Sequence, residues 1–276
     1  MQQVKLQFDH QNDYRTREAF KTLRTNIEFC GGVKVLAVTS CTPNEGKSSI
    51  AMEMARAFAE AGNRTMLIDA DMRKSVLVGR YKTGAVRLGL THCLAGKAGY
   101  QEVMCATNIP SLYVTFSGPV PPNPSELLGG DKFSAVVEHL KEKFDYLIID
   151  TPPLGSVIDA AVAARNCDGI VLVIENNAIS YKFVQRVKDQ MDKAGARILG
   201  VVLNKVDMTG KGYYGHYGKY YGKYYGKYYG KYGEEGESRG IEGRVKAETK
   251  SSARKAREYQ DDIGADGADI EYLEDL

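Results

Sequence analysis

The chain has 276 residues, with 37 Lys and Arg against 35 Asp and Glu, and a formal net charge of +2. This near-neutral balance argues against nucleic acid as the main partner. The five cysteines lack Cys-x-x-Cys spacing, which argues against a disulfide framework and a zinc site. The polar start is not expected to be a signal peptide, and no apolar run reaches the roughly 20 residues that cross a bilayer. Any membrane association is therefore expected to come through a partner.

The first predicted helix follows a polar lead-in over residues 1–14. Apolar residues recur at helical spacing over residues 15–29, and two glycines at positions 31 and 32 end this helix. Its polar side carries Glu18, Lys21 and Arg24, charges that most often form a solvated helix face.

The stretch over residues 35–49 reads V-L-A-V-T-S-C-T-P-N-E-G-K-S-S, and the rest of the chain is organised around it. It predicts a buried parallel strand over 35–38, a phosphate-binding loop, and a helix over 50–61. In such a P-loop, backbone N–H groups hold a triphosphate, a lysine reaches its outer phosphates and a serine binds Mg²⁺. The predicted nucleotide-binding residues are Thr42, Pro43, Asn44, Glu45, Gly46, Lys47, Ser48 and Ser49.

This loop departs from the usual P-loop pattern at two positions. Cys41 stands where G-x-x-x-x-G-K-[ST] has its first glycine. Asn44 stands where a further glycine would be comfortable, and Asn is the non-glycine residue that best tolerates a left-handed backbone. The loop therefore still predicts phosphate binding, with a possible change in nucleotide affinity.

Two later strands also end in carboxylates. The strand predicted over residues 65–68 runs into Asp69, Asp71 and Arg73, and the strand over 146–149 runs into Asp150. The carboxyl ends of strands are where α/β sheets bind ligands, and an apolar strand with a terminal Asp is the Walker B pattern. Oxygen ligands suit Mg²⁺, so Ser48 and Asp150 are predicted metal ligands, and the pair Asp69 and Asp71 offers both a metal ligand and a base.

The rest of the first 209 residues alternates helices and strands. We predict helices over 88–95, 132–143, 156–166 and 180–194, and strands over 112–116, 169–174 and 198–203. The prolines in G-P-V-P-P-N-P-S-E-L-L, residues 118–128, exclude a regular element before about Ser125. This alternation predicts an α/β fold with a doubly wound, mainly parallel sheet and right-handed crossovers.

The composition changes abruptly beyond residue 209. Residues 210–233 consist mainly of Lys, Gly and Tyr with K-Y-Y-G repeated, and residues 234–276 are polar and become acidic toward the end. Neither segment can bury enough apolar surface to offset its ordering entropy, so both are predicted to be disordered. The domain plan is therefore a lead-in (1–14), a P-loop domain (15–209), a tyrosine tail (210–233) and an acidic extension (234–276). The tail tyrosines are Tyr213, Tyr214, Tyr217, Tyr220, Tyr221, Tyr224, Tyr225, Tyr228, Tyr229 and Tyr232.

A P-loop and strand-end carboxylates at one edge of a sheet predict a site for one Mg-nucleotide. The natural chemistry is phosphoryl transfer to water or to a hydroxyl, which needs positioning and charge neutralisation more than covalent participation. A carboxylate near the outermost phosphate can take a proton from a phenol or from water.

These motifs together resemble the cytoplasmic bacterial tyrosine kinases of capsule and exopolysaccharide systems, the single-chain type that works with a separate transmembrane adaptor. The resemblance covers roughly residues 15–232. It rests on T-S-C-T-P-N-E-G-K-S (39–48), L-I-D-A-D-M-R (67–73), I-I-D-T-P (148–152), P-P-N-P-S-E-L-L (121–128) and the tyrosine cluster.

The resemblance implies roles for individual residues, with ATP as substrate and Mg²⁺ as cofactor. Lys47 would bind phosphate, and Asp69 would be the base toward the tyrosine hydroxyl. The other implied residues are Asp71 and Arg73 in catalysis, Ser48, Asp71 and Asp150 around Mg²⁺, and Asn204 at the nucleotide.

The resemblance also implies partners. A neighbouring subunit of a homo-oligomer, ring-shaped in this family, would phosphorylate the tail tyrosines. An adaptor that controls polysaccharide chain length would activate the kinase through its cytoplasmic segment and recruit it from the cytoplasm to the membrane, and a tyrosine phosphatase would oppose it. The family's E-x-x-R-x-x-R interface motif corresponds to Glu18, Lys21 and Arg24. Lys21 lacks the guanidinium fork of arginine, so a weaker interface is expected.

Three alternatives remain open on the sequence. A GTPase is suggested by N-K-V-D at residues 204–207, which has the N-K-x-D form that reads guanine. A partition or division-site switch ATPase usually carries an extra lysine early in its P-loop, where this chain has Ser40, Cys41 and Thr42. A scaffold that binds nucleotide without transferring phosphate would need to have lost catalytic groups, all of which are present here.

Overall fold

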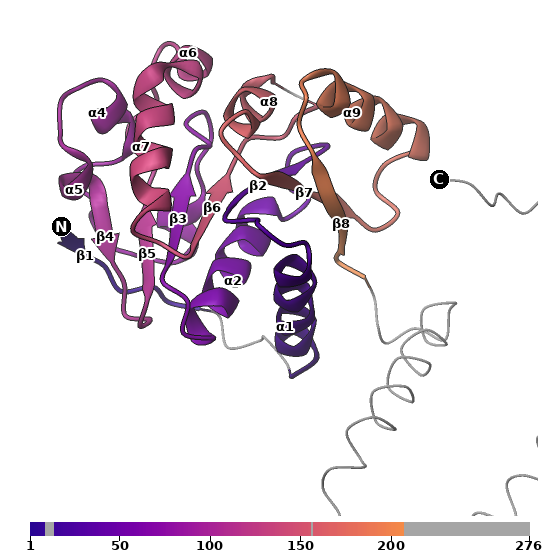
Figure 1. Ribbon diagram of the computed structural model, residues 1–276, viewed down its shortest axis with the longest axis horizontal. Helices are drawn as coiled ribbons and strands as arrows, with labels where there is room; N and C mark the ends of the chain where they lie inside the picture. The colour runs from indigo at the N-terminus through magenta and orange to yellow at the C-terminus, as the bar shows by residue number, and fades with distance from the viewer. Residues whose placement is uncertain (9–13, 156, 207–276) are drawn as a thin grey trace, which may run out of the picture. The chain divides into compact units, whose positions relative to one another are not determined.

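The computed structural model describes residues 1–8, 14–155 and 157–206, so the tyrosine tail and the acidic extension lie outside the described residues. The described strands form one eight-stranded sheet in the order β1-β4-β5-β3-β6-β2-β7-β8 (Figure 1). Neighbouring strands are parallel except β4 and β5, which confirms the prediction of a mainly parallel sheet. The strands are β1 (Gln2–Gln3), β2 (Val35–Ser40), β3 (Thr65–Asp69), β4 (Met104–Ala106), β5 (Leu112–Thr115), β6 (Tyr146–Asp150), β7 (Gly169–Glu175) and β8 (Ile198–Asn204).

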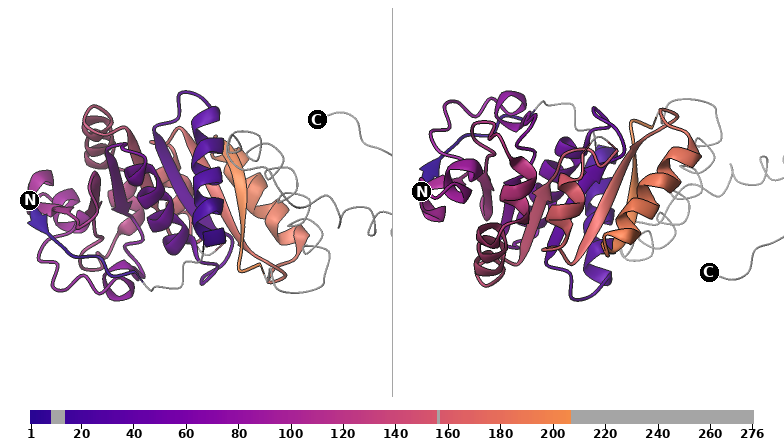
Figure 2. Two further views of the ribbon diagram at one scale, coloured as in Figure 1. Left: turned by 90° about the horizontal axis from the view of Figure 1, so that it is seen from below. Right: turned by 90° about the horizontal axis from the view of Figure 1, so that it is seen from above.

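Helices cover both faces of the sheet, as the doubly wound prediction requires (Figure 2). Helices α1 and α2 lie on one face, and α7, α8 and α9 lie on the other. Among the described residues, no helix combines the length and the hydropathy needed to cross a membrane. The helices are α1 (Tyr14–Phe29), α2 (Lys47–Glu60), α3 (Leu77–Arg80), α4 (Leu90–Leu94), α5 (Tyr100–Val103), α6 (Pro124–Gly129), α7 (Asp131–Lys141), α8 (Asp159–Ala164) and α9 (Tyr181–Lys193).

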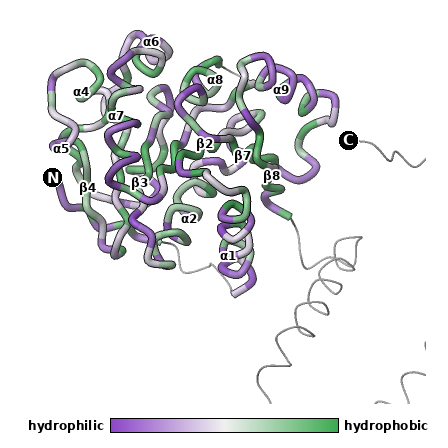
Figure 3. Tube along the Cα trace, in the orientation of Figure 1, coloured by the Kyte–Doolittle hydropathy of each residue, from purple (hydrophilic) through white to green (hydrophobic). Residues whose placement is uncertain are grey.

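The central strand β2 is buried along its whole length. Leu36 and Val38 pack into the cluster that α1 and α2 cover, whereas Val35 and Ala37 belong to clusters on the opposite face. Successive side chains of a strand point to opposite faces, so a strand covered on both sides needs an uninterrupted apolar run. Figure 3 shows hydrophobic residues along the strands and hydrophilic residues on the outer sides of α7 and α9.

Several short elements were not predicted from the sequence, namely β1, β4, α3 and α5. These have between two and four residues, too few for a periodic pattern to be visible. β1 lies in the polar lead-in, where Val4 and Leu6 are buried against the core. Helix α6 begins at Pro124, a position in the first turn where the missing N–H of proline costs no hydrogen bond.

The register of the sheet brings the predicted carboxylates to one edge. Asp69 at the end of β3 lies directly beside Asp150 at the end of β6. Val38 of β2 also pairs with Asp150, and the P-loop begins three residues after Val38. The strand ends therefore converge as predicted, and the candidate site lies at this edge.

Asp168 lies at the amino ends of the strands, opposite the candidate site, and connects the start of β7 to the start of β2. One of its carboxylate oxygens accepts hydrogen bonds from the backbone N–H groups of Lys34 and Val35, both at 2.8 Å, and Lys141 Nζ lies 3.4 Å from the other oxygen. Burial tends to raise the pKa of Asp168, but the two backbone hydrogen bonds and Lys141 outweigh it, so the pKa is lowered.

We expect Asp168→Ala to lower the free energy of unfolding at pH 7 by about 1–2 kcal/mol, because the buried N–H of Val35 and the exposed N–H of Lys34 both lose a charged acceptor. A carboxyl group whose pKa is lower in the folded state stabilises the folded protein at pH values above its unfolded pKa. This contribution is lost as the pH falls through the folded-state pKa. The difference between wild type and variant in urea unfolding should therefore be full at pH 7 and shrink below about pH 4. Glu142→Gln, at an exposed carboxylate, is the control and should show neither effect.

Candidate active site

The P-loop joins β2 to α2 through residues 41–46. Gly46 (φ 95°) and Asn44 (φ 68°) both adopt the left-handed conformation, which confirms that Asn44 can serve where a glycine would be comfortable. A Cβ atom at Gly46 would collide with the side chain of Asn204. The buried Cys41 replaces the first glycine of the pattern, and burial raises the pKa of its thiol to about 12, so it stays protonated.

Two side chains at the end of β8 hydrogen-bond to the backbone of this loop. Asn204 Nδ2 donates to the backbone oxygen of Glu45 at 2.8 Å, and Lys205 Nζ donates to the backbone oxygen of Asn44 at 2.9 Å. Lys205 also pairs with Glu175 at 2.8 Å. Asn204 was predicted to contact the nucleotide, and the structure places its amide on the loop that would bind the phosphates. The Asn and Lys of N-K-V-D are thus engaged with the P-loop backbone, and Asp207 lies outside the described residues.

Glu45 points into the protein. It is 1% exposed, and its carboxylate accepts hydrogen bonds from the backbone N–H groups of Thr42 (2.7 Å) and Glu175 (3.4 Å). It was predicted as a nucleotide-binding residue, and in the structure its side chain shapes the loop from inside. The sequence motif could not reveal this orientation, because the position is variable in the P-loop pattern.

Lys47 reaches into a cluster of three carboxylates. Its Nζ atom lies 2.9 Å from Asp71 Oδ2 and 3.8 Å from Asp150 Oδ1, and it donates to Ser48 Oγ at 3.2 Å. Asp69 and Asp150 are fully buried, and Asp71 is 3% exposed. One lysine therefore faces three buried carboxyl groups, and the cluster retains excess negative charge when all are ionised.

The burial of this cluster shifts the pKa values of its members. Burial is the largest cause that raises the pKa of Asp69, and the charge of Asp150 adds to it. Burial also raises the pKa of Asp150, although Lys47 acts in the opposite direction. Burial alone would lower the pKa of Lys47, but Asp150 and Asp71 outweigh it and raise the value. Two carboxyls with raised pKa values at a strand-end edge are typical of a catalytic site.

The residues fit a magnesium ion. Both carboxylate oxygens of Asp150 and Oδ1 of Asp69 are buried without a hydrogen-bond partner among the described residues. Buried polar atoms normally have partners, so such oxygens indicate a place for a cation. The described residues hold no group of three or more His, Cys, Asp or Glu side chains placed to bind a metal together, so the protein alone does not supply a full set of ligands. Mg²⁺ suits this arrangement, since it is usually held by one or two carboxylates together with phosphates and water.

Two serines hold Asp69, and neither was predicted. The Ser75 hydroxyl and the backbone N–H of Ser117 (3.4 Å) both donate to Asp69 Oδ2. Ser75 lies in the loop after β3, and Ser117 follows β5, 48 residues beyond Asp69. Nothing in the sequence signals this pairing, since it depends on β3 and β5 being neighbours in the sheet.

Arg73 was predicted as a catalytic residue, and the structure pairs it with α8. Its Nε and Nη2 atoms donate to the two oxygens of Asp159 at 2.7 and 3.0 Å, and Nη2 also donates to Ser125 Oγ at 3.2 Å. Asp159 is fully buried. Burial would raise its pKa, but the hydrogen bonds from Arg73 and Ser125 outweigh burial and lower it. Ser125 belongs to the P-P-N-P-S-E-L-L stretch and Arg73 to the D-A-D-M-R motif, so their hydrogen bond joins the two motifs.

The end of the P-loop contacts α3, since Arg80 Nη1 donates to Ser49 Oγ. Ser49, predicted to bind nucleotide, is therefore tied to α3.

Comparisons with known proteins agree with this geometry. A family model described as an AAA domain matches residues 33–199. The tyrosine-protein kinase CpsD of Streptococcus agalactiae is 46% identical over 208 residues, which span 74% of this chain and 91% of that protein. The chain belongs to the bacterial tyrosine-protein kinases.

Solved structures support the same assignment. The chimerical protein CapA2B2 superposes with a TM-score of 0.68 at 33% identity, covering 75% of this chain and 94% of that one. The kinase domain of the Escherichia coli tyrosine kinase ETK gives a TM-score of 0.67 at 28% identity, covering 77% and 94%. The fold and the family predicted from the sequence are thus confirmed.

The charged residues predicted for a subunit interface of this kinase lie on α1. Lys21 pairs with Glu18 at 2.7 Å, and both are well exposed. Arg24 is more buried, because Nη1 donates to the backbone oxygen of Ala57 in α2 at 3.1 Å and Nε lies 3.5 Å from Glu28. Arg24 therefore helps to hold α1 on α2 within one subunit.

We expect Asp150→Asn to raise the stability of the kinase while it weakens the effect of Mg-ATP. The substitution removes a buried charge that has no hydrogen-bond partner among the described residues. Losing this desolvation cost should raise the free energy of unfolding by about 1–2 kcal/mol without nucleotide, equivalent to roughly 2–8 °C in Tm. Mg-ATP should raise the Tm of the variant less than that of wild type. A lower Tm without nucleotide, or an undiminished response to Mg-ATP, would contradict the role given to Asp150.

Proposed function

We propose that this chain is an ATP-dependent protein-tyrosine kinase that phosphorylates its own C-terminal tyrosine cluster between neighbouring subunits. The observation that supports this most is the meeting of a P-loop lysine with three strand-end carboxylates in a member of the bacterial tyrosine kinase family. The cluster offers a phosphate-binding cation, metal ligands and a proton acceptor within one buried group. We further propose that phosphorylation regulates capsular or exopolysaccharide synthesis or export.

Each residue of the cluster has a proposed role. The P-loop backbone over residues 42–49 holds the ATP phosphates, and Lys47 neutralises charge on the transferred group. Ser48, Asp71 and Asp150 would hold Mg²⁺, which when bound neutralises phosphate charge and orients the outer phosphates. Asp69 takes the proton of the tyrosine hydroxyl.

The transfer step balances with these groups. The phenolic oxygen forms a bond to the γ-phosphorus while the bond from that phosphorus to the β–γ bridging oxygen breaks. ADP leaves with the electron pair of the broken bond, and the phenolic proton moves to the Asp69 carboxylate. The raised pKa of Asp69 makes it a stronger proton acceptor than an exposed aspartate.

Arg73 is proposed to act from a fixed position. Asp159 and Ser125 engage its Nε and Nη2 atoms, which leaves Nη1 without a hydrogen bond to the described residues. We propose that Nη1 contacts the transferred phosphate or the acceptor segment, with Asp159 setting its direction.

The proposed partners follow from the family. The kinase would assemble with further copies of itself through Glu18, Lys21 and Arg24, and a transmembrane adaptor would activate it at the inner face of the membrane. A tyrosine phosphatase would reverse the modification.

The test is the intact mass of the full-length protein after incubation with Mg-ATP, with and without a peptide from the cytoplasmic segment of the adaptor. We expect stepwise additions of phosphate that map to Tyr213–Tyr232 and are absent when these ten tyrosines are replaced by phenylalanine. Release of free phosphate without protein modification would instead indicate a switch ATPase, and release from GTP alone would indicate a GTPase.

A further inference from the structure

Arg80, the last residue of α3, carries a positive charge that no carboxylate of the described residues neutralises. Arg24, Arg56 and Arg73 each form an ion pair with a carboxylate, and Arg80 forms none in the described part of the chain. Its guanidinium instead reaches the start of α2, where Nη1 donates to Ser49 Oγ. An unpaired cation is therefore held beside the phosphate-binding loop.

The backbone around Arg80 is fixed, although α3 has only four residues. The Arg80 N–H donates to the backbone oxygen of Val76 at 2.9 Å. The next residue, Tyr81, is buried, and its ring lies 5.0 Å from the ring of Phe8. The backbone oxygen of Tyr81 also accepts from the N–H of Gln7 at 3.0 Å. The N-terminal segment and the core thus hold the end of α3, so the reach of the Arg80 side chain starts from a set position.

Ser49 lies in the first turn of α2, where a P-loop binds phosphate. The N–H groups of residues 47–49 have no acceptor within the helix, since the bond from the Ile50 N–H to the oxygen of Gly46, at 3.0 Å, is the first of this turn. No side chain caps this end of the helix. Such N–H groups and the helix dipole favour an anion. Arg80 adds a full positive charge where the backbone offers partial ones.

The carboxylate cluster leaves room for a second cation. Lys47 is already shared between Asp71 and Asp150, so it brings little excess positive charge to a triphosphate. Burial raises the pKa of Asp150 and Lys47 lowers it, and Arg80 acts in the same direction as Lys47. The charge of Arg80 therefore acts within the site, although a carboxylate does not hold its side chain.

We infer that Arg80 binds a phosphate of the nucleotide that is not transferred and that remains in ADP. The inference rests on the nucleotide site of the proposed function and adds to it a binding residue from outside the P-loop. In that proposal the transferred phosphate lies between Lys47 and Asp69. Arg80 meets the loop at Ser49 instead, two residues farther along α2. A contact present in both ATP and ADP strengthens binding without accelerating the transfer.

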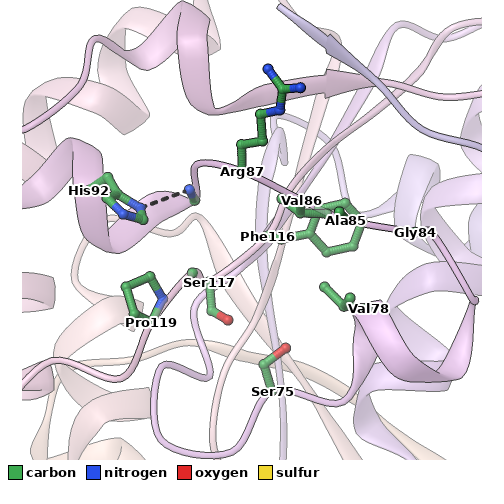
Figure 4. Close-up of a pocket in the computed structure, with 12 residues that line it drawn as sticks. Ser75, Val78, Gly84, Ala85, Val86, Arg87, His92, Phe116, Ser117 and Pro119 are labelled. Carbon is green, nitrogen blue, oxygen red and sulfur yellow. Dashed lines mark hydrogen bonds between the residues drawn. The ribbon is translucent and has the colours of Figure 1, made fainter.

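Arg87 provides a matched control on the other side of α3. It lines a pocket of about 370 Å³ to which α3 contributes Val78 (Figure 4). Arg87 is exposed, and in Figure 4 its guanidinium points away from Ser75 and Ser117, the residues that hold Asp69. Both arginines belong to the connection between β3 and β4. Replacing either by glutamine removes the same charge, and only one replacement removes a contact with the P-loop.

The experiment measures nucleotide binding to the full-length protein by isothermal titration calorimetry with Mg²⁺ present. The ligands are ADP and the β,γ-imido analogue of ATP, which does not transfer its outer phosphate. We expect Arg80→Gln to weaken both about tenfold and by equal factors within twofold, because a hydrogen bond between charged groups is lost. Arg80→Lys keeps the charge and should weaken both less. Arg87→Gln should bind both ligands within twofold of wild type.

Several outcomes would overturn the inference. One is wild-type affinity for ADP in Arg80→Gln. Another is a loss confined to the ATP analogue, since Arg80 would then contact the transferred phosphate. An equal loss in Arg87→Gln would indicate a general effect of net charge. The Tm without nucleotide should stay close to that of wild type, as it does for most surface substitutions. A fall of more than about 5 °C would assign Arg80 to folding instead.

Kinetics of tail phosphorylation give a second readout. In Arg80→Gln the KM for ATP should rise by the factor seen in binding, with kcat within about threefold of wild type. A kcat lowered by about 10²-fold or more at an unchanged KM would overturn the inference. The binding measurement needs no phosphoryl transfer. If ADP binding depends on Arg80 as expected while no tyrosine is phosphorylated, the proposed function fails and the role of Arg80 at the nucleotide stands.

Discussion

Lys47→Met is expected to lower tail phosphorylation by at least about 10³-fold and to weaken ATP binding. Lys47 is the cation closest to Asp71 and Asp150 in the cluster and the P-loop residue expected to neutralise the transferred phosphate. Removing one preorganised charge from a site that excludes water typically costs 10²–10³ in rate, and loss of ATP affinity adds to this. The measurement is intact mass over time at saturating and limiting ATP.

The same substitution should change stability, so a loss of activity needs a control for folding. Methionine leaves Asp69, Asp71 and Asp150 without their buried cation, and an uncompensated buried charge is strongly destabilising. We therefore expect a lower Tm for Lys47→Met that recovers partly on mild acidification, as the carboxyls take up protons. Lys47→Arg keeps the charge with a different geometry, so it should retain most of the stability and little of the activity. Normal phosphorylation by either variant would contradict the role of Lys47.

Asp69→Asn is expected to lower the rate of tyrosine phosphorylation by about 10²–10⁴-fold, with little change in the KM for ATP. Asparagine keeps the shape of the side chain and can still accept from Ser75 and Ser117, but it cannot take up the phenolic proton. The rate should be measured at saturating ATP with the peptide Gly-Lys-Tyr-Tyr-Gly-Lys, which copies residues 222–227, as acceptor.

Two controls distinguish a loss of the catalytic base in Asp69→Asn from a loss of a metal ligand or a nonspecific effect of removing a carboxylate. Glu142→Gln removes an exposed carboxylate and should behave as wild type. The Mg²⁺ concentration for half-maximal activity should stay the same in Asp69→Asn, because the proposed metal ligands are Ser48, Asp71 and Asp150. An activity within tenfold of wild type would exclude Asp69 as the base, and a large shift in the Mg²⁺ requirement would make it a metal ligand instead.

The sequence predicted those parts of the site that a local motif defines. The P-loop, the strand ends at Asp69 and Asp150, and the left-handed Asn44 each depend on residues within one strand-loop segment, and each is confirmed. The convergence of the carboxylates followed from a further rule, since parallel strands bring their carboxyl ends to one edge.

The parts that were missed depend on contacts between distant segments. The bridge from Arg73 to Asp159 spans 86 residues, and Glu45 accepts one of its two hydrogen bonds from the backbone of Glu175, 130 residues away. A motif shows that Arg73 is present but not what it pairs with. The one available signal was Ser125, since it lies in a stretch that already stood out beside the P-loop motifs.

The brace between β8 and the P-loop has a consequence for the tyrosine tail. Asn204 is hydrogen-bonded to the phosphate-binding loop, so the tail starts from a point fixed to the nucleotide site of its own subunit. A chain spans at most about 3.3–3.6 Å per residue. Tyr213, nine residues on, can reach no farther than about 30 Å from this anchor, whereas Tyr232, 28 residues on, can reach about 95 Å. In the proposed phosphorylation between subunits, the position of each tyrosine would therefore set the largest separation at which a neighbouring subunit could phosphorylate it.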